Sequence, residues 1–301
     1  MPILYGLNFM VDAGLKKSRH RLYSEWNDIY SGKTDASLLI MGSSRAWVHY
    51  SPVVLDDILK TKSYNIGMNG WGFSMQYARL KILLRHNPKP KYIIQNLETS
   101  LLQRRENLYE YQQFLPYLND PIIRSASKGY KGEFSLTQYY LPLFKYNGNW
   151  DLAGIGLLNY FGFQTNQTSK YKGYEGQELE WDGSYDKFKL AYPNGLIEKI
   201  DADAERDFEE YLNYCKENGI KVFLVYSPEY FEVQDFTINR KDVMAMFQSY
   251  AKKYDIPLLD YSNHPICFDK SYFYNSQHLN KKGSELFSKI LAQDLLNLGI
   301  N

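Results

Sequence analysis

The sequence predicts an α/β protein, a three-layer α/β/α sandwich around a parallel sheet of five strands. Short apolar segments alternate with helical patterns before residue 100 and again after residue 200. This alternation is typical of a parallel sheet covered by helices on both faces. The length of 301 residues also fits one α/β domain of up to about 250 residues that carries an insertion. We therefore expect a single domain over residues 1–301, with an insertion or cap at residues 100–195.

Five segments are predicted as strands because each is a short, mostly apolar run that stops at polar or turn residues. The first run, Ser37-Leu-Leu-Ile-Met41, ends at Gly42, and continuous apolar runs of this length are typical of buried parallel strands. Numbered along the chain, the strands are expected in the spatial order 2-1-3-4-5. They lie near residues 37–42, 62–66, 91–97, 220–226 and 256–260.

The helices are predicted from their periodicity and from the residues at their ends. Ser51 and Pro52 are a favourable N-cap and first-turn pair, and Gly219 is placed to end a helix as its C′ residue. The predicted helices cover residues 14–30, 74–85, 201–218, 240–254 and 280–298, with a further one starting at residue 51.

The segment between the third and fourth strands is rich in aromatic residues. The whole chain is 16% aromatic with 28 tyrosines, and this segment has many turn residues and weak periodicity. We expect it to be partly helical and partly irregular. Its rings could pack a core, or an exposed subset could line a cleft for sugar rings or acyl chains. Both interpretations stay open for Tyr139, Tyr140, Trp150, Tyr160, Phe161 and Trp181.

Composition and charge exclude several functions. The net charge of +1 argues against broad attraction to nucleic acid or to an acidic membrane. Two cysteines, Cys215 and Cys267, are too few for a disulfide-dense scaffold or a four-cysteine zinc site. No apolar run of about 18 residues predicts a transmembrane segment. The first ten residues are too short for a signal peptide, although they could be the remnant of a removed anchor.

Neither a cofactor nor a metal is expected. Residues 32–34 (Gly-Lys-Thr) look like the end of a P-loop, but the earlier glycine is missing and the segment precedes a strand instead of following one. The glycines between residues 67 and 72 lack dinucleotide-binding spacing. No group of His, Asp or Glu residues has the spacing of metal ligands.

Polar residues that suit acyl transfer follow the predicted strands. In an open parallel sheet, ligands bind beyond the carboxyl ends of the strands. Ser44 follows the first strand, Gly70 the second, Asn96 lies in the third, and His278 lies beyond the fifth. A serine nucleophile needs a base to take its proton, and the oxyanion needs preorganised donors. These residue types are the parts of a serine acyl-transfer site.

Five histidines limit the choice of base. Two of them, His20 and His86, lie in helical contexts away from the carboxyl edge of the sheet, and His49 follows Ser44. His264 and His278 both lie in the last loop. We favour His278 because it leads directly into the closing helix.

The four segments together resemble the SGNH (GDSL-like) hydrolases. The resemblance is stronger to their bacterial cell-envelope branch of acyl-transfer and acetylesterase-like proteins, similar to those of alginate and teichoic acid modification. Gly42-Ser43-Ser44 is similar to the family's Gly-Asp-Ser turn, and this implies that Ser44 is the nucleophile. The resemblance covers roughly residues 35–100 and 200–300 and implies a flavodoxin-like fold.

The other blocks imply the remaining roles. The spacing from Asn65 to Gly70 implies that Gly70 is an oxyanion donor, and Asn96 is similar to the family's oxyanion asparagine without its flanking glycine and aspartate. The last block, Asp-x-x-His in the family, is here Asn275-Ser-Gln-His278.

Asn275 departs from the family pattern. An asparagine can orient an imidazole through its amide oxygen, but it cannot stabilise the imidazolium by charge. Three outcomes stay open: a Ser–His dyad, a substitute acid at Asp269 or Glu98, or a site without catalysis. Arg45, next to the nucleophile, is expected to form a surface salt bridge or, less favoured, to meet an anionic substrate group.

The resemblance implies a serine esterase or O-acyltransferase that acts on an acylated carbohydrate or cell-envelope polymer, or on another small ester. The alternative is a non-catalytic module that binds a carbohydrate or a partner on the same scaffold. No nucleic-acid partner is expected, and the sequence leaves the oligomeric state open. An extracytoplasmic location in the cell envelope follows from the resemblance alone, and a cytoplasmic one stays open.

Overall fold

The computed structural model describes residues 2–165 and 167–300, and the chain divides into two compact units. The first unit comprises residues 1–34, 78–87 and 105–170, and the second comprises residues 35–77, 88–104 and 171–301. The expected insertion is thus divided, since residues 105–170 group with the N-terminal helices while residues 171–195 group with the sheet. That the first unit caps the strand edge stays a prediction.

The second unit is built on a parallel sheet with the strand order β2-β1-β3-β4-β5, which confirms the predicted order. Leu38 of β1 lies opposite Ser63 of β2 on one side and Tyr92 of β3 on the other. Each strand lies inside its predicted range. The strands are β1 (Leu38–Met41), β2 (Ser63–Asn65), β3 (Tyr92–Leu97), β4 (Lys221–Tyr226) and β5 (Leu258–Asp260).

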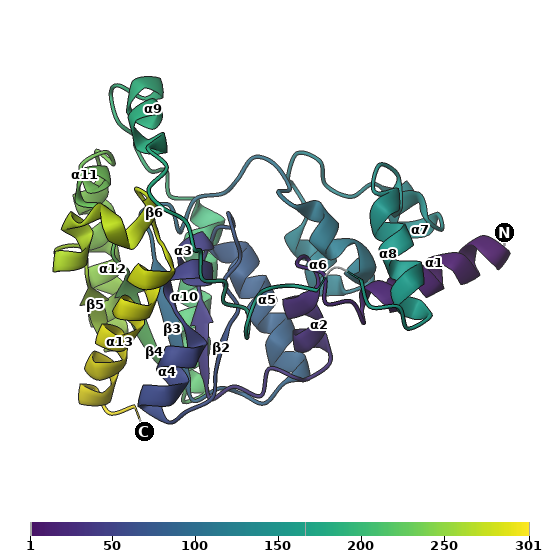
Figure 1. Cartoon of the computed structure of the whole chain (residues 1–301), viewed down its shortest axis with the longest axis horizontal. Coiled ribbons are helices and arrows are strands. Elements are labelled where there is room, and N and C mark those ends of the chain that lie inside the picture. Colours follow the sequence, from purple (N-terminus) through teal and green to yellow (C-terminus); the bar gives the residue numbers. More distant parts are fainter. Residues whose placement is uncertain (1, 166, 301) are drawn as a thin grey trace. The chain divides into compact units, whose positions relative to one another are not determined.

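Helices cover both faces of the sheet (Figure 1). On one face lie α4 (Pro52–Leu59) and α13 (Lys281–Asn297). On the other lie α10 (Ala202–Glu217), α12 (Arg240–Tyr254) and the first turn of α5 (Phe73–His86). Ring contacts join these three helices, with 4.9 Å between the centroids of Phe73 and Phe208 and 5.9 Å between those of Phe208 and Phe247.

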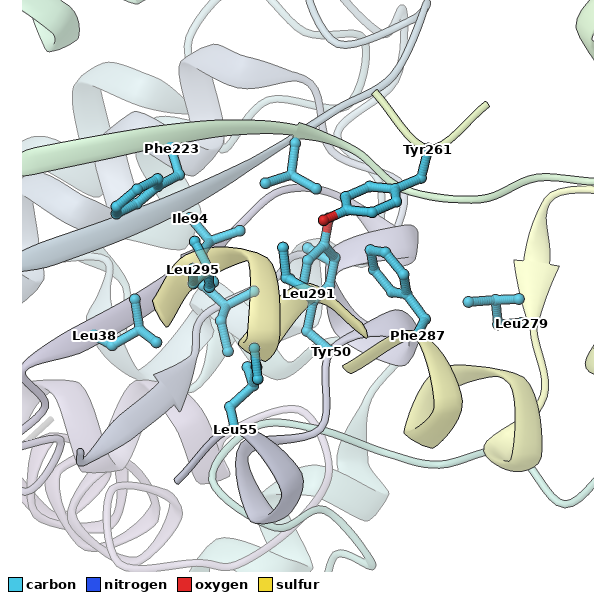
Figure 2. Close-up of a cluster of buried hydrophobic side chains, with 14 of the residues drawn as sticks. Leu38, Tyr50, Leu55, Ile94, Phe223, Tyr261, Leu279, Phe287, Leu291 and Leu295 are labelled. Carbon is cyan, nitrogen blue, oxygen red and sulfur yellow. The ribbon is translucent and has the colours of Figure 1, made fainter. Parts of the chain in front are cut away.

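The core under α4 and α13 is drawn in Figure 2. Alternate strand residues, among them Leu38, Ile94 and Phe223, meet Leu55 of α4 and Leu291 of α13. Each such buried side chain contributes about 1.5–3 kcal/mol through the removal of apolar surface from water. This packing fixes α13, and therefore the loop that precedes it, against the carboxyl ends of the strands.

Short elements beyond the strand ends complete the second unit. A two-stranded antiparallel sheet, β6 with β7, is absent from the sequence prediction and pairs Asn275 with His278. The remaining elements are α3 (Ser44–His49), α9 (Ser184–Ala191), α11 (Phe231–Gln234), η3 (Pro265–Phe268), η4 (Lys270–Tyr272), β6 (Phe273–Asn275) and β7 (His278–Leu279).

The strap, as we name residues 171–182, runs from the edge of the sheet to the β6–β7 hairpin. The backbone N–H of Asn65 donates to the carbonyl of Lys172 at 2.9 Å, and that of Asp182 donates to the carbonyl of Tyr274 at 2.9 Å. A Cβ on Gly173 would lie 1.8 Å from the carbonyl oxygen of Asn65. Only glycine therefore allows the strap to approach β2 so closely.

The first unit is helical, and its aromatic residues divide into buried and exposed groups. Tyr30 and Tyr117 stack with centroids 4.5 Å apart, whereas Tyr140, Trp150 and Phe161 are mostly exposed. Packing thus explains part of the aromatic excess, and a role of the exposed rings in a cleft stays a prediction. The elements are α1 (Pro2–Leu15), α2 (Ser24–Tyr30), η1 (Tyr111–Tyr117), α6 (Pro121–Ala126), α7 (Leu136–Tyr140), η2 (Phe144–Tyr146) and α8 (Trp150–Tyr160), with the end of α5.

One predicted helix, residues 14–30, is wrong. Instead α1 ends at Leu15 and α2 starts at Ser24. The Asn27 side chain donates to the carbonyls of Leu15 at 2.9 Å and Ser18 at 2.7 Å. These bonds satisfy carbonyl groups at the end of α1 and stabilise the break.

Within residues 2–165 and 167–300, no helix combines the length and the apolar composition that a membrane-spanning segment needs.

Candidate active site

The turn after β1 places Ser44 at the carboxyl edge of the sheet. Gly42 has a φ of 150°, and a Cβ there would lie 2.6 Å from the Cβ of Ala46 and 2.8 Å from that of Asn96. Glycine is therefore required for the chain to turn directly from β1 into α3. Ser44 is the first residue of this helix.

Ser44 and His278 lie in hydrogen-bond contact. The distance from Ser44 Oγ to His278 Nε2 is 2.7 Å, and the distance from His278 Nδ1 to Asn275 Oδ1 is 2.9 Å. Asn275 Oδ1 also accepts from the backbone N–H groups of Gln277 and His278, each at 3.0 Å. An atom that accepts from two backbone N–H groups must be the amide oxygen.

This assignment fixes the tautomer of His278. Because Asn275 Oδ1 can only accept, the proton of the ring lies on Nδ1 and Nε2 is left as an acceptor. The Ser44 hydroxyl can then donate to Nε2, which is the orientation that a general base needs. The β6–β7 hairpin holds this arrangement, and the Tyr274 ring stacks on the imidazole at a centroid distance of 5.3 Å.

Burial, together with the cationic Arg45, lowers the pKa of His278 to about 4. The carboxylate of Asp182, at the end of the strap, acts in the opposite direction and raises that pKa. A neutral amide in contact with the ring supplies no charge that would favour the imidazolium. The histidine is therefore neutral at pH 7 and a weak base.

The two substitute acids, Glu98 and Asp269, do not reach His278, whose Nδ1 is bonded to Asn275. Instead, Glu98 accepts from Ser43 Oγ at 2.5 Å and from Asn96 Nδ2 at 3.1 Å. Asp269 accepts from the backbone N–H of Ser271 at 2.8 Å in an exposed turn. Both carboxylates hold loops.

The predicted oxyanion donors lie on either side of the Ser44 turn. Gly70 has a φ of 70° in the loop after β2, a conformation that favours glycine. Asn96 is fully buried, with its Oδ1 accepting from the Tyr50 hydroxyl at 2.6 Å and one amide N–H directed to Glu98. Its role as an oxyanion donor, like that of Gly70, stays a prediction.

Arg45 is buried, not on the surface. It is 3% exposed, forms an ion pair with Glu229 at 3.1 Å and donates to the carbonyl of Ser227. The hydroxyl of Tyr226 donates to the other oxygen of Glu229. The expected salt bridge exists, but it is internal and joins α3 to the loop after β4.

His49 is a structural residue that the sequence did not assign. Its Nε2 accepts from the backbone N–H of Leu279 at 3.0 Å, so its Nδ1 carries the proton and donates to Ser227 Oγ at 2.9 Å. Burial and Arg45 lower the pKa of His49 well below its ordinary value. The spacing of four residues from Arg45 places both on one face of a helix and is the sequence signal that could have identified the pair.

The similarity of this chain to known proteins is a similarity of fold. No family model and no curated protein matches the chain. Two solved structures of similar path are a GDSL-like lipase from Bacteroides thetaiotaomicron (13% identity, 86% of this chain and 88% of that chain, TM-score 0.37) and a protein provisionally described as an acylhydrolase from Bacteroides fragilis (14%, 88% and 88%, TM-score 0.42). Another is a protein provisionally described as a lipolytic protein of the G-D-S-L family from Desulfitobacterium hafniense (11%, 85% and 98%, TM-score 0.42).

The site defines a class by its own geometry: a serine hydroxyl on an imidazole whose second nitrogen is held by an amide oxygen. Within residues 2–165 and 167–300, no group of three His, Cys, Asp or Glu side chains could hold a metal ion.

Proposed function

We propose that this chain is a serine esterase or O-acyltransferase of the SGNH type, with Ser44 as nucleophile and His278 as general base. The observation that supports this most directly is the 2.7 Å contact between Ser44 Oγ and His278 Nε2, in the tautomer that Asn275 imposes. A histidine that served only as a helix cap would have no need of this geometry.

The reaction has two halves. Ser44 Oγ attacks the acyl carbonyl carbon while its proton passes to His278 Nε2, and the tetrahedral oxyanion then expels the alcohol, which takes that proton. Water or an acceptor hydroxyl next attacks the acyl-enzyme, with His278 again as base. The Ser44 and Gly70 backbone N–H groups and the Asn96 amide are the proposed oxyanion donors, and each such donor is worth about 2.7–4 kcal/mol.

The proposed substrate is an acylated carbohydrate or another small ester. The family resemblance supports the acylated carbohydrate and the extracytoplasmic envelope. The choice between hydrolysis and transfer depends on whether water or a hydroxyl reaches the acyl-enzyme.

The rival function is a non-catalytic binding module, and Asn275 in place of an aspartate is the observation in its favour. A module that binds without catalysis would not require Ser44 to be aligned on a base. A serine-directed fluorophosphonate, followed by mass measurement of the modified peptide, separates the two. We expect one adduct on wild type and on Ser43→Ala, and none on Ser44→Ala or after acid unfolding. An unmodified wild-type chain would contradict the esterase.

The Asn275→Asp variant is expected to raise kcat/KM for p-nitrophenyl acetate by about tenfold or more, because a carboxylate on Nδ1 stabilises the imidazolium in the transition state. The matched control is Asp269→Asn, which removes a nearby carboxylate that does not touch the ring. An Asn275→Asp chain that is folded but no faster would mean that Asn275 only holds the hairpin through the N–H groups of Gln277 and His278.

The activity of the wild type is expected to stay constant above about pH 5 and to be half-lost near pH 4, because only neutral His278 can act as the base. In Asn275→Asp the acidic limb should move up by about one pH unit or more, since the new negative charge favours the protonated ring. A limb that stays in place would show that His278 is not the titrating base.

The same titrations affect folding, with a definite sign. His278 and His49 have lowered pKa values in the folded chain, so the unfolded chain binds protons first as the pH falls below about 6.5. Stability is therefore present above that pH and decreases below it. Near-UV circular dichroism at each pH separates unfolding from the loss of the base.

A further inference from the structure

A polar cavity is lined by residues that neighbour the proposed site along the chain. Its volume is about 280 Å³, and it is lined by residues from the loops after β3 and β4, the segment before α10, the start of α12 and the turn before His278. Two wall residues are chain neighbours of the site: Thr99 follows Glu98, and Gln277 precedes His278. A third wall residue, Glu229, forms the ion pair with Arg45. The cavity therefore lies at the carboxyl edge of the sheet, the edge that also carries Ser44.

Arg240 gives this cavity its unusual chemistry. Its Nε and Nη2 atoms are buried and have no hydrogen-bond partner among the described residues. Its guanidinium lies over the ring of Tyr226, 5.0 Å from the centroid. Arg45, whose guanidinium also lies over the Tyr226 ring at 4.8 Å, is by contrast paired with Glu229 and Ser227. A partly buried cation whose Nε and Nη2 atoms lack acceptors is unfavourable unless a ligand supplies one.

The carboxylates of the cavity are already committed to other groups. Glu229 accepts from Arg45 and from Tyr226. Glu198 accepts from Thr99 at 3.1 Å and from Gln103, and burial raises the pKa of the Glu198 carboxyl. Within the part of the chain that the structure describes, Arg240 forms no ion pair, so its positive charge remains available to a ligand.

We propose that this cavity binds a carboxylate group of the substrate and that Arg240 is the residue that selects it. The inference rests on the proposed function, because it names the class of ester that Ser44 would receive: an ester that carries a second, free carboxylate. A planar carboxylate matches the fork of a guanidinium. A phosphate monoester, with nearly two negative charges, would meet stronger repulsion from Glu198 and Glu229.

The test uses binding, so that it does not depend on turnover. Monomethyl esters of succinic, glutaric and adipic acid are titrated calorimetrically into Ser44→Ala protein, each beside its neutral dimethyl ester. At least one half-ester is expected to bind about tenfold to a hundredfold more tightly than its dimethyl partner, the range of a charge-assisted hydrogen bond. The three chain lengths sample different spans between the ester carbonyl and Arg240.

The variants have expected effects of opposite sign. Adding Arg240→Gln should abolish the preference for the half-ester, and Arg240→Lys should keep part of it. Glu198→Gln keeps the partners of Glu198 but removes its charge, so it should strengthen binding of the half-ester. Lys241→Gln, an exposed change in the same helical turn, is the matched control and should have no effect.

Equal affinity for half-ester and dimethyl ester at all three lengths would overturn the proposal, as would a preference that persists in folded Arg240→Gln protein. The two proposals fail independently. A half-ester preference without wild-type turnover would refute the esterase and leave the carboxylate site. Turnover without the preference would refute the carboxylate site alone.

Discussion

Ser44→Ala is expected to lower the turnover of p-nitrophenyl acetate by about 10⁴-fold or more, as the loss of the nucleophile does in serine enzymes. The physical reason is that no other hydroxyl takes its place. Ser43 is adjacent in sequence, but its Oγ donates to Glu98 at 2.5 Å, whereas the His278 imidazole contacts Ser44. The variant removes one part-buried hydrogen bond to His278 and no apolar packing, so it should fold normally.

Ser43→Ala is the matched control for this prediction. It deletes a hydroxyl from the same turn and should change turnover by less than about tenfold, the effect of one ordinary hydrogen bond. Rates are measured under saturating substrate together with thermal unfolding of each variant. Equal rates in wild type and Ser44→Ala would mean that the observed hydrolysis is nonspecific catalysis by the protein surface. That result would refute the role of Ser44 as nucleophile.

His278→Ala is expected to have an effect of similar size, about 10⁴-fold or more, because base and nucleophile act as one unit and their losses do not add. Without the imidazole, the Ser44 hydroxyl keeps its proton at neutral pH and attacks slowly. The ring stacks on Tyr274, so its removal leaves a space of imidazole size. Free imidazole should therefore restore part of the activity.

His264→Ala is the control for His278→Ala. His264 lies in the same loop region, where its Nδ1 accepts from the backbone N–H of Ile266 at 3.3 Å, and its loss should leave turnover unchanged. Full activity in His278→Ala would identify another base. A His278→Ala protein that is misfolded, and whose activity free imidazole does not restore, would indicate that His278 serves the structure of the hairpin.

His49 sets a limit on such experiments. It bonds to the backbone of Leu279 on one side and to Ser227 on the other, so its replacement would disturb the hairpin that carries His278. A loss of activity in a His49 variant would thus report on stability first. This distinction between the two histidines depends on which ring nitrogen accepts from a backbone N–H, and only the tertiary structure shows it.

The sequence determined the architecture of the sheet because local pattern carries that information. Apolar runs such as residues 37–41 and 220–226 can be buried only between two layers of helices, and the order of the strands follows from few allowed connections. It also gave the residues at the strand ends, including Ser44 and His278, since the carboxyl edge gathers them. The sequence pattern does not predict the break between α1 and α2. The break is stabilised by the side chain of Asn27, in α2, which bonds to the carbonyls of Leu15 and Ser18, and periodicity carries no information on such contacts.

Only the tertiary structure decided which hydrogen-bond and ion-pair partners the site residues have. Whether Asn275, Glu98 or Asp269 holds His278 could not be read from the sequence, since Glu98 follows the third predicted strand and the other two share the last loop with His278. The fold settled it because the two-residue turn of the β6–β7 hairpin places the amide oxygen of Asn275 on the ring, while Ser43 and Asn96 occupy Glu98. Arg45 and Arg240 have the same chemistry in sequence. Arg45 is buried beside Glu229 and forms an ion pair with it, whereas Arg240 lines the cavity without an ion pair among the described residues. The sequence gives the charge of each side chain, but the residues that neutralise that charge come from distant parts of the chain and are brought together only by the fold.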